Sequence, residues 1–456
     1  MTDRPATGDD VDLSAPLVVG FGVVGRALTA ALTARGIQPV VIEDRPSDAS
    51  REAAAASGID MVEAPESADL DARIGQASVL LPSPGVPDHH PAFASAATFG
   101  LPVRSEFDLA RMWDDRPLVA ITGTNGKTTV TTMVTDALDR SGIAAVAVGN
   151  TEVPLVTAID DASIEVFVVE ASSFRLGHSA CFSPKVATWL NLAPDHLDAH
   201  ASYEAYVEAK AAIWANLPPD GLAVANAADP VVMAHLPSDR RVERFALDPS
   251  LRAEWTCRNG TVVGPDGPVV TVDELVRSQP HDIENALAVA ATASAAGATG
   301  EGIARALAAF SGLPHRVELV GEWGGIRWFN DSKATVPQAT EAAIGGFESV
   351  VLLAGGRNKG LALDGLRNTV PPVRHVVAMG DASAEVAEVF EGLVPVTAAS
   401  SMEDAIAMAD HAAQTGDVVL LSPGCTSFDW YPNYVERGLD FTRLVRRLAQ
   451  DKVGRP

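Results

Sequence analysis

The residues best suited to chemistry lie in the stretch "ITGTNGKTTV" at positions 121–130. Gly126, Lys127 and Thr128 stand in the order that ends a phosphate-binding loop, although Ile121 occupies the place of the usual first glycine. In such a loop the backbone N–H groups and the start of the next helix receive phosphate, the lysine supplies charge and the threonine hydroxyl binds Mg²⁺. The stretch therefore predicts a nucleoside triphosphate site made of Gly123, Thr124, Asn125, Gly126, Lys127, Thr128 and Thr129.

Phosphoryl transfer also needs metal ligands, and carboxylates at strand ends are suited to that role. Glu170 closes the apolar run "VFVVE" and is the predicted Mg²⁺ ligand. The next predicted strand is followed by His196, which stands among Asp195, Asp198 and His200. His196 could bind a metal or be an exposed loop histidine, and its residue type leaves both readings open.

Lys210 lies in a predicted helix, "SYEAYVEAKAAIWANL", on the same face as Tyr206, Val207, Ile213 and Trp214. A lysine on this apolar face could run its stem along the core and keep its ammonium at the rim. Alternatively, desolvation could lower its pKa, so that the neutral amine reacts with CO₂ and becomes a metal-binding carbamate. The spacing alone does not choose between these readings.

The element that opens the chain is a predicted strand, a glycine-rich turn from Gly20 to Gly25, an Ala/Leu-rich helix and a second strand ending in Glu43, Asp44 and Arg45. This is the βαβ fingerprint of dinucleotide-binding folds, and taken alone it indicates an NAD site. A glycine turn without a ligand is the alternative. Further on, "LLPSPGVPDHHP" is another strand end where the backbone could approach a ligand.

Three series of strands and helices follow one another along the 456 residues, and this pattern predicts an α/β fold with three domains. The expected domains are a Rossmann-like domain over 1–106, a central phosphate-loop ATPase domain with a mostly parallel sheet over 107–313, and a Rossmann-like α/β domain over 314–456.

Composition excludes several classes of protein. A formal net charge of −25 argues against a nucleic-acid-binding surface. A run of 18 apolar residues and a basic, apolar signal segment are both missing, and Cys181, Cys257 and Cys425 stand in no metal-ligand spacing. We therefore expect a cytoplasmic protein without membrane insertion. A monomer is a separate expectation that composition does not decide. Of the six lysines, four fall in motifs: Lys127, Lys210, Lys333 and Lys359.

Taken together, the motifs resemble those of the Mur ligases of peptidoglycan synthesis. The segments "GTNGKTT", "EASSF", "NLAPDHLDAH", "HDIENALAVAATA", "LPHRVE", "NDSKAT", "GGRNKG" and "SPGCTSFDWYPNYVERG" occur in that family's order and span essentially the whole chain. The resemblance implies that the glycine-rich turn receives a UDP-sugar in place of NAD. It also implies an ATP-dependent amide ligase that uses two Mg²⁺ ions and works through an acyl phosphate.

Within the family, the set is most similar to members that add D-glutamate to UDP-N-acetylmuramoyl-L-alanine and release ADP and phosphate. A related ligase that uses L-glutamate or another acceptor stays open. The alternative from a different class is an NAD-binding oxidoreductase or regulatory module built on the turn from Gly20 to Gly25.

The resemblance also implies roles for individual residues. The nucleotide-sugar would be bound by Gly22, Val23, Val24, Glu43, Asp44, Arg45, Ser83, Asn150, Ser172 and Arg175. The catalytic and metal-binding set would be Lys127, Thr128, Glu170, His196 and a carbamylated Lys210, with Asn285, Arg316 and Asp331 also holding ATP. The incoming glutamate would meet Lys333, Thr335, Lys359, Ser427 at a helix start, Phe428 and Tyr434.

The chain departs from the family pattern near the expected acceptor. Thr151 and Glu152 follow Asn150 where Ile-Gly is usual, Arg175 replaces a common glutamine, and Asn358 stands where aspartate is frequent. We hypothesise that Arg175 pairs with a carboxylate of the acceptor.

Overall fold

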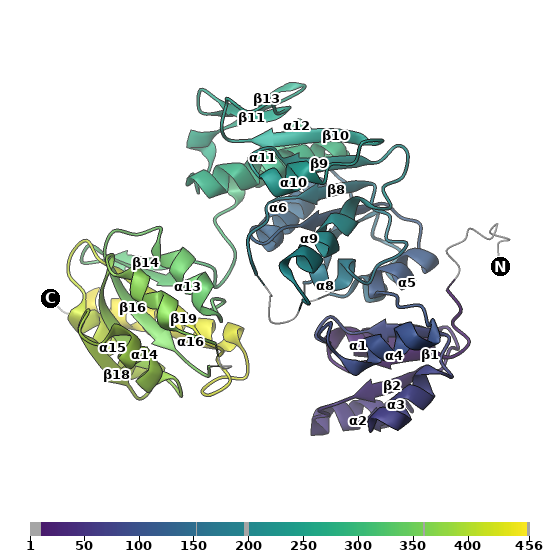
Figure 1. The fold of residues 1–456 in the computed structure, drawn as a ribbon. Coiled ribbons are helices and arrows are strands. Elements are labelled where there is room, and N and C mark those ends of the chain that lie inside the picture. The colour runs from purple at the N-terminus through teal and green to yellow at the C-terminus, as the bar shows by residue number, and fades with distance from the viewer. Residues whose placement is uncertain (1–10, 152, 196–199, 359–360, 454–456) are drawn as a thin grey trace. The chain divides into compact units, whose positions relative to one another are not determined.

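The computed structural model describes residues 11–151, 153–195, 200–358 and 361–453 (Figure 1). The chain divides into two compact units, Met1–Phe310 and Ser311–Pro456. The first unit contains two sheets and the second contains one, so each predicted domain has its own sheet and the expected α/β class is confirmed. The domain limits themselves stay predictions, although the division between the units falls close to the limit predicted at 313/314.

The first sheet is parallel and has the strand order β3-β2-β1-β4. Its strands are β1 (Pro16–Val19), β2 (Val40–Glu43), β3 (Asp60–Glu63) and β4 (Val79–Pro82), with helices α1 (Val23–Ala34), α2 (Asp48–Ala56), α3 (Ser67–Ile74) and α4 (Pro91–Phe99). The strands β1 and β4 are buried along their whole length, because helices cover both faces of a parallel sheet. The βαβ unit predicted around the glycine-rich turn is confirmed.

The second sheet has nine strands in the order β13-β12-β11-β10-β9-β8-β5-β7-β6. The strands β5 to β11 pair in parallel, and β11, β12 and β13 form antiparallel hairpins at one edge. The strand β5 lies between β7 and β8, where the order of the strands reverses, and ligands bind beyond the carboxyl ends at such a point. The strands are β5 (Leu118–Thr122), β6 (Ala145–Gly149), β7 (Val166–Glu170), β8 (Val186–Trp189), β9 (Leu222–Asn226), β10 (Arg241–Ala246), β11 (Trp255–Arg258), β12 (Thr261–Gly264) and β13 (Gly267–Thr271).

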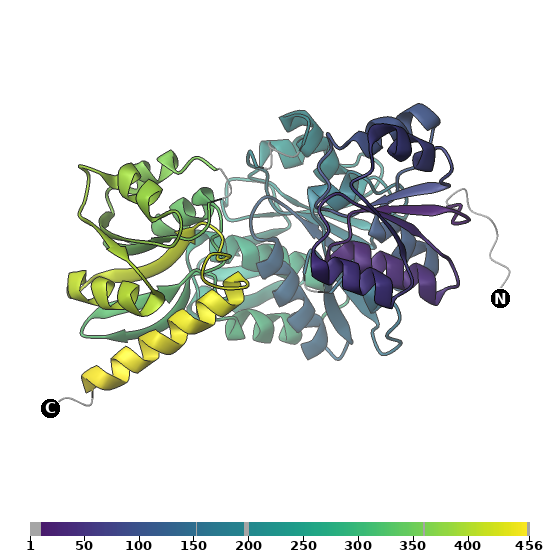
Figure 2. The same cartoon turned by 90° about the horizontal axis from the view of Figure 1, so that it is seen from below.

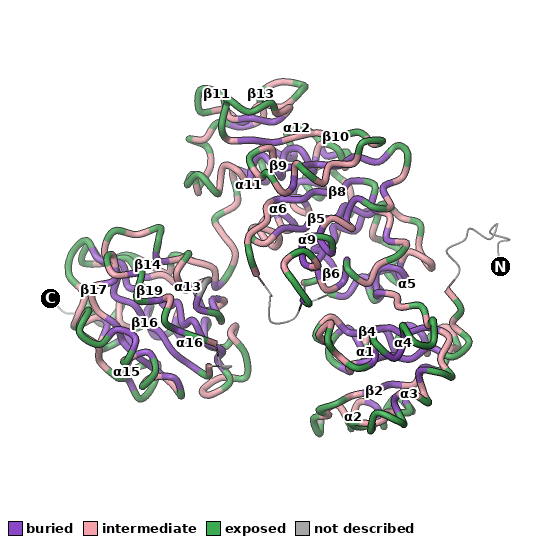
Figure 3. Tube along the Cα trace, in the orientation of Figure 1, coloured by how far each residue is buried: buried purple, intermediate pink, exposed green. Residues whose placement is uncertain are grey.

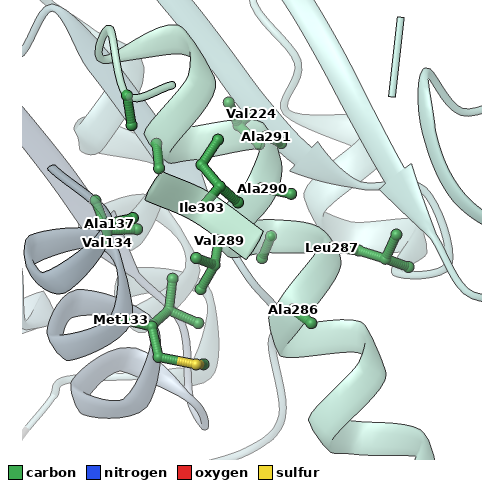
Figure 4. Close-up of a cluster of buried hydrophobic side chains, with 14 of the residues drawn as sticks. Met133, Val134, Ala137, Val224, Ala286, Leu287, Val289, Ala290, Ala291 and Ile303 are labelled. Carbon is green, nitrogen blue, oxygen red and sulfur yellow. The ribbon is translucent and has the colours of Figure 1, made fainter. Parts of the chain in front are cut away.

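Helices pack on both faces of this second sheet, and the side chains between them form the largest core. The helices are α5 (Glu106–Trp113), α6 (Lys127–Arg140), α7 (Leu155–Ala158), α8 (Ser173–Leu176), α9 (Tyr203–Ala211), α10 (Pro230–Ala234), α11 (Pro280–Ala295) and α12 (Gly300–Ala309), with short 3₁₀ turns η1 (Ala212–Trp214) and η2 (Val272–Glu274). In Figure 4, Met133, Val134 and Ala137 of α6 meet the alanine-rich side of α11 and Ile303 of α12. These contacts fix the helix that begins at Lys127.

The second unit is built on a six-stranded sheet with the order β14-β15-β19-β16-β17-β18. Only the edge pair β14 and β15 is antiparallel among its described strands. Its elements are β14 (Glu318–Trp323), β15 (Ile326–Asn330), α13 (Pro337–Ile344), β16 (Val350–Gly355), η3 (Asp364–Thr369), β17 (Val373–Met379), α14 (Ser383–Phe390), β18 (Val396–Ala399), α15 (Met402–Ala412), β19 (Val418–Gly424) and the long helix α16 (Tyr434–Val453), yellow in Figure 2.

Burial follows the layers. In Figure 3 the strands are mostly buried and the outer sides of the helices and the turns are exposed. Within the described residues, no helix combines the length and the apolar composition needed to cross a bilayer.

Candidate active site

The predicted phosphate loop joins β5 to α6 at the point where the strand order reverses. Gly126 has φ +83°, and a side-chain carbon there would lie 2.7 Å from Asn285 Oδ1, so glycine is required for both conformation and space. Lys127 donates through Nζ to Gly123 O at 2.8 Å and Thr124 O at 2.9 Å. The loop therefore places the lysine charge over its own centre, and Asn285 of α11 lies beside it.

The loop is held by the segment that follows β8. The backbone N–H groups of Thr124 and Asn125 donate to Asn191 Oδ1 at 3.1 and 2.9 Å, and Asn191 Nδ2 donates back to Asn125 O at 3.2 Å. The Thr124 hydroxyl lies 3.0 Å from the Tyr206 hydroxyl of α9, and burial raises the pKa of Tyr206 to about 12. These contacts tie the loop to the segment after β8 and to α9.

Glu170 ends β7 in register with Ile121 of β5, so its carboxylate lies at the same sheet edge as the loop. One carboxylate oxygen accepts from Asn150 Nδ2 at 3.1 Å. The other oxygen is buried and has no hydrogen-bond partner within the described part of the chain. An anionic oxygen left in this state fits a metal ligand, because burial of an unpaired charge is unfavourable. His196 lies outside the described residues, and no cluster of three metal-binding side chains occurs among those described.

Lys210 lies on the buried face of α9, as its spacing predicted, and is 2% exposed. Its Nζ donates to Gly123 O at 2.8 Å, the same oxygen that Lys127 contacts. Burial, and secondly the charge of Lys127, hold the pKa of Lys210 well below its usual range. The buried position argues against an ammonium at the rim, and the carbamate stays a prediction.

A cavity of about 980 Å³ lies beside this edge, between the first two sheets. It is lined by predicted nucleotide-sugar residues, namely Gly22, Val23, Val24, Glu43, Asp44, Arg45, Ser83, Asn150 and Arg175. Because Asn150 also donates to Glu170, the cavity reaches the side chain that would hold the metal. Ser172 does not line the cavity; its hydroxyl is buried and makes no hydrogen bond to any described residue.

The wall formed by the glycine-rich turn is fixed by side chains predicted to bind substrate. Ser83 Oγ donates to Gly20 O at 2.7 Å, and Glu43 accepts from the N–H groups of Phe21 and Arg45 at 2.6 and 3.0 Å. Both residues therefore fix the backbone of the wall, and the carboxylate of Glu43 already accepts two backbone hydrogen bonds. Asp44 pairs with His90 of the opposite loop at 2.9 Å.

Arg175 forms part of the inner wall of the cavity and is 5% exposed. Its Nε lies 3.5 Å from Glu106 Oε2, too long for a strong hydrogen bond, and its Nε and Nη1 have no hydrogen-bond partner among the described residues. Burial raises the pKa of Glu106, while the charge of Arg175 lowers it. A guanidinium with donors to spare at a cavity wall is suited to bind an anion.

In the second unit, predicted ligand-binding residues follow two strands: Asp331, Lys333 and Thr335 come after β15, and Ser427 and Phe428 come after β19. Arg437, 2% exposed, donates from Nη2 to Ser332 O at 2.9 Å and to Cys425 O at 3.1 Å, which ties the two strand ends together. Lys333 Nζ lies 4.0 Å from the centre of the Tyr434 ring. The hydroxyl of Ser427 is buried and lacks a hydrogen-bond partner in the described part of this unit.

Comparison with known proteins agrees with this geometry. Residues 121–293 match the model of the Mur ligase middle domain, and residues 315–425 match that of the Mur ligase glutamate ligase domain. A UDP-N-acetylmuramoylalanine–D-glutamate ligase of Frankia casuarinae is 40% identical over 94% of this chain and 93% of its own length. This chain belongs to the Mur ligase family. An enzyme of the same name from Shouchella clausii is 38% identical over 95% of this Mur ligase and 97% of its own length.

Solved structures share the fold at low identity. A pseudomurein peptide ligase of Methanothermus fervidus has a TM-score of 0.57 at 18% identity, covering 95% of this Mur ligase and 100% of that chain. A UDP-N-acetylmuramate–alanine ligase of Thermotoga maritima has a TM-score of 0.55 at 18% identity, covering 96% of this Mur ligase and 99% of that chain. The enzyme is thus an ATP-dependent ligase with the three-sheet fold of this family, and nothing in these comparisons supports an oxidoreductase.

One prediction about this Mur ligase is wrong in its local structure. Ser427 was expected at a helix start, but it lies in a turn, and α16 begins only at Tyr434. Ser427 O instead accepts from the N–H groups of Trp430 and Tyr431, at 3.2 and 2.8 Å. The proline and the aspartate between Ser427 and Tyr434 favour such a turn. Phe428, beside it, is 53% exposed, and Lys359 lies outside the described residues.

Sequence reasoning missed several residues that hold the site. Asn191 and Tyr206 hold the phosphate loop, Glu106 faces Arg175, and Arg437 joins the two strand ends of the second unit. Glu106 and Arg437 are buried charged residues, but their burial depends on partners distant in the chain. Arg316 and Asp331 lie in the second unit, and Asn285 and Thr129 in the first.

Asp331 of this Mur ligase gives a test of the second unit. Burial raises the pKa of its carboxyl to about 7, although Ser422 Oγ donates to it at 2.7 Å. The ionised form is therefore disfavoured in the fold, and stability is lost as the pH rises from about 4 through 7. We expect Asp331→Asn, which cannot ionise, to unfold at a higher temperature than wild type near pH 8, with a gain on the order of 2–4 kcal/mol and a smaller gain near pH 5. Equal gains by calorimetry at both pH values would contradict this.

Proposed function

We propose that this Mur ligase joins D-glutamate to UDP-N-acetylmuramoyl-L-alanine, with conversion of ATP to ADP and phosphate. The observation that carries the proposal is the sharing of Gly123 O by Lys127 and Lys210, at the sheet edge where Glu170 contacts Asn150 of the cavity lining. The names of the similar ligases from Frankia casuarinae and Shouchella clausii support the choice of substrates.

The reaction follows from the charges. A carboxylate is a poor electrophile, so the L-alanyl carboxylate first attacks the γ-phosphorus of ATP and becomes an acyl phosphate, with ADP as the leaving group. Lys127 offsets the negative charge that spreads over the phosphoryl oxygens, and the loop N–H groups orient them. The amine of glutamate then attacks the acyl carbon, expels phosphate and leaves an amide. Because anions must be held close together, positioning accounts for much of the rate.

Mg²⁺ when bound would supply positive charge to the phosphoryl oxygens. Glu170, Thr128 and Lys210 as its carbamate are the described residues that would hold it, and His196 is proposed with them. The unpartnered oxygen of Glu170 and the depressed pKa of Lys210 support this set. Asn285, Arg316 and Asp331 are proposed to hold ATP.

The residues that would receive glutamate lie in the second unit. Its two carboxylates call for cations and hydroxyl donors, and Lys333 with the unpartnered hydroxyl of Ser427 provides one of each. Thr335, Lys359, Phe428 and Tyr434 complete the proposed set.

The test is phosphate release from ATP and Mg²⁺ with UDP-N-acetylmuramoyl-L-alanine, with D-glutamate, L-glutamate or no amino acid. Release that needs D-glutamate, together with the matching amide in the product, is the expected result. Release with L-glutamate alone would change the stereochemistry of the assigned amino acid. If neither amino acid gave phosphate release, the assignment of UDP-N-acetylmuramoyl-L-alanine as the acceptor would be rejected. A thermal shift by NAD but not by the UDP-sugar would favour the oxidoreductase alternative.

Arg175 provides a prediction for the acceptor site. Replacement by glutamine, the residue common in the family, removes a positive charge from a residue of the cavity wall. We expect Arg175→Gln to raise the KM for the UDP-sugar acceptor by about 10- to 100-fold, as expected for loss of a charged hydrogen bond, with the KM for ATP unchanged. Initial-rate kinetics check this, and an unchanged acceptor KM would reject a role for Arg175 in binding the acceptor.

Location and assembly are part of the proposal as well. Cys181, Cys257 and Cys425 are all free thiols, which supports a reducing compartment such as the cytoplasm. A monomer is proposed, and light scattering during gel filtration tests it.

A further inference from the structure

Four side chains of the first unit form a cluster that the proposed reaction does not use. His200 Nδ1 lies 3.0 Å from Asp88 Oδ2, and His200 Nε2 lies 2.9 Å from Ser173 Oγ. His178 Nε2 lies 3.6 Å from the other oxygen of Asp88. We call these four residues the Asp88 clasp. One carboxylate thus meets two imidazoles, and the chain of contacts ends on a serine hydroxyl.

The clasp connects two different sheets. Asp88 belongs to the loop over 84–90, which follows β4 of the first sheet, and the other three residues belong to segments of the second sheet. Aromatic contacts flank the polar ones, because His178 stacks on Phe93 at 4.7 Å and His200 stacks on Phe174 at 4.9 Å. The side chain of His200 is 3% exposed, so its contacts are shielded from water.

The same loop forms one wall of the 980 Å³ cavity. Pro84, Pro87 and His89 of the loop line it, and Asp88 lies among them. On the other side of the clasp, Ser173 begins α8, which also carries the cavity residue Arg175. The clasp therefore joins the two walls that an acceptor would contact.

A second contact between these sheets lies at α1 and differs in kind. Ala27 and Ala31 of α1 pack with the core around α5 and α7, and Arg35 lies 4.1 Å from the centre of the Trp113 ring. Arg35 also pairs with Asp160 at 2.9 Å, but the Asp160 side chain is 59% exposed. The α1 contact is largely apolar, whereas the clasp depends on directional contacts of a few side chains.

The order Ser173, His200, Asp88 is that of a nucleophile, a base and an orienting acid. Ser173 is only 2% exposed and is not among the residues that line the cavity, so a substrate in the cavity does not reach its hydroxyl. The arrangement is thus suited to positioning and not to attack on a substrate.

We propose that the Asp88 clasp holds the loop over 84–90 against α8 and so sets the shape of the cavity for the UDP-linked acceptor. Asp88, Ser173 and His200 are then positioning residues for acceptor binding. This inference rests on the proposed function, because it takes the acceptor to be the ligand of the cavity. The clasp itself, however, can be tested without any substrate.

The first experiment is hydrogen–deuterium exchange on the full chain without ligands, comparing wild type with Asp88→Ala, Asp88→Asn and Ser173→Ala. Asp160→Asn is the matched control, since it removes a carboxylate that also joins the two sheets but lies outside the clasp and the cavity. We expect faster exchange over 84–90 and over α8 in Asp88→Ala, a smaller change in Asp88→Asn, and no change in the control. Unchanged exchange in both Asp88 variants would overturn the proposal.

The second experiment is initial-rate kinetics on the same variants. Asp88→Ala should raise the KM for UDP-N-acetylmuramoyl-L-alanine by about tenfold or more, while kcat and the KM for ATP stay within about twofold. Asp160→Asn should leave every constant within about twofold of wild type. Equal rises in the KM for acceptor and for ATP would indicate general loosening and overturn the proposal. Ser173→Ala should raise the KM for the acceptor, whereas Ser173→Thr, which keeps the hydroxyl, should have a KM for the acceptor close to that of wild type.

The two proposals fail in different ways. If wild type releases no acceptor-dependent phosphate, the proposed function fails, whatever the exchange data show. If wild type is active and Asp88→Ala binds the acceptor as wild type does, the clasp fails and the proposed function stands. Should Asp88→Ala not fold, the comparison of Ser173→Ala with Ser173→Thr decides the outcome on the same measurements.

Discussion

Lys210→Arg is expected to lower D-glutamate-dependent phosphate release by about 1,000-fold, the loss expected when a group that stabilises transition-state charge is removed. Arginine keeps a positive charge and a long stem, but its guanidinium stays protonated and cannot form the carbamate proposed for Lys210. A cation would then replace the proposed anion at the sheet edge that also carries Glu170, where metal ions are proposed to bind. Lys210 is buried at Gly123 O, so the larger group also meets the loop directly.

A spectroscopic measurement separates the carbamate from packing. In ¹³C-labelled bicarbonate, wild type is expected to show a carbamate carbon resonance that Lys210→Arg lacks. Since burial and the charge of Lys127 lower the pKa of Lys210, more of its amine is neutral and able to react with CO₂ than that of an exposed lysine at the same pH. Full activity of Lys210→Arg, or a wild-type spectrum without the resonance, would contradict the prediction.

Lys127→Ala is the second substitution with a large expected effect. Lys127 contacts two carbonyl oxygens of its own loop, so its charge is aimed at the loop centre. Removal should lower phosphate release by about 1,000-fold, because no other described side chain of the loop carries a positive charge to the phosphoryl oxygens. Quenched-flow measurement of ADP formation tests whether the loss lies in the chemical step.

Lys185→Ala is the matched control for Lys127→Ala. Lys185 also belongs to the second sheet's domain, but it pairs with Asp220 and its side chain is 45% exposed. Exposed ion pairs contribute little, so activity should stay within about twofold of wild type. A comparable loss in both variants would point to a general effect of charge and would contradict the assigned role of Lys127.

The remaining predictions concern single contacts. Asp331→Asn reports on a buried carboxyl in the second unit, and Arg175→Gln reports on the acceptor wall. Their readouts, a thermal transition and an acceptor KM, do not depend on each other. The two results therefore test the two units separately.

Much of the fold could be predicted from the sequence because its signals are local. Apolar runs that end in glycine or in an acid predicted the strands around Gly20, Ile121 and Glu170, and alternating helices predicted parallel sheets. The helical spacing around Lys210 also predicted its buried face. Ser427 was misplaced because the choice between a helix start and a turn depends on the residues that follow it, and these favour a turn.

Thus the sequence by itself determined the family motifs, the order of strands and helices, and the residues at the strand ends where ligands bind. Tertiary structure alone decided which atoms those residues meet. Lys210 reaches Gly123 O across 87 residues, and Asp88 reaches His200 across 112. Such pairings depend on how sheets and helices pack, and packing sums weak contacts over the whole core, so no short stretch of sequence encodes them.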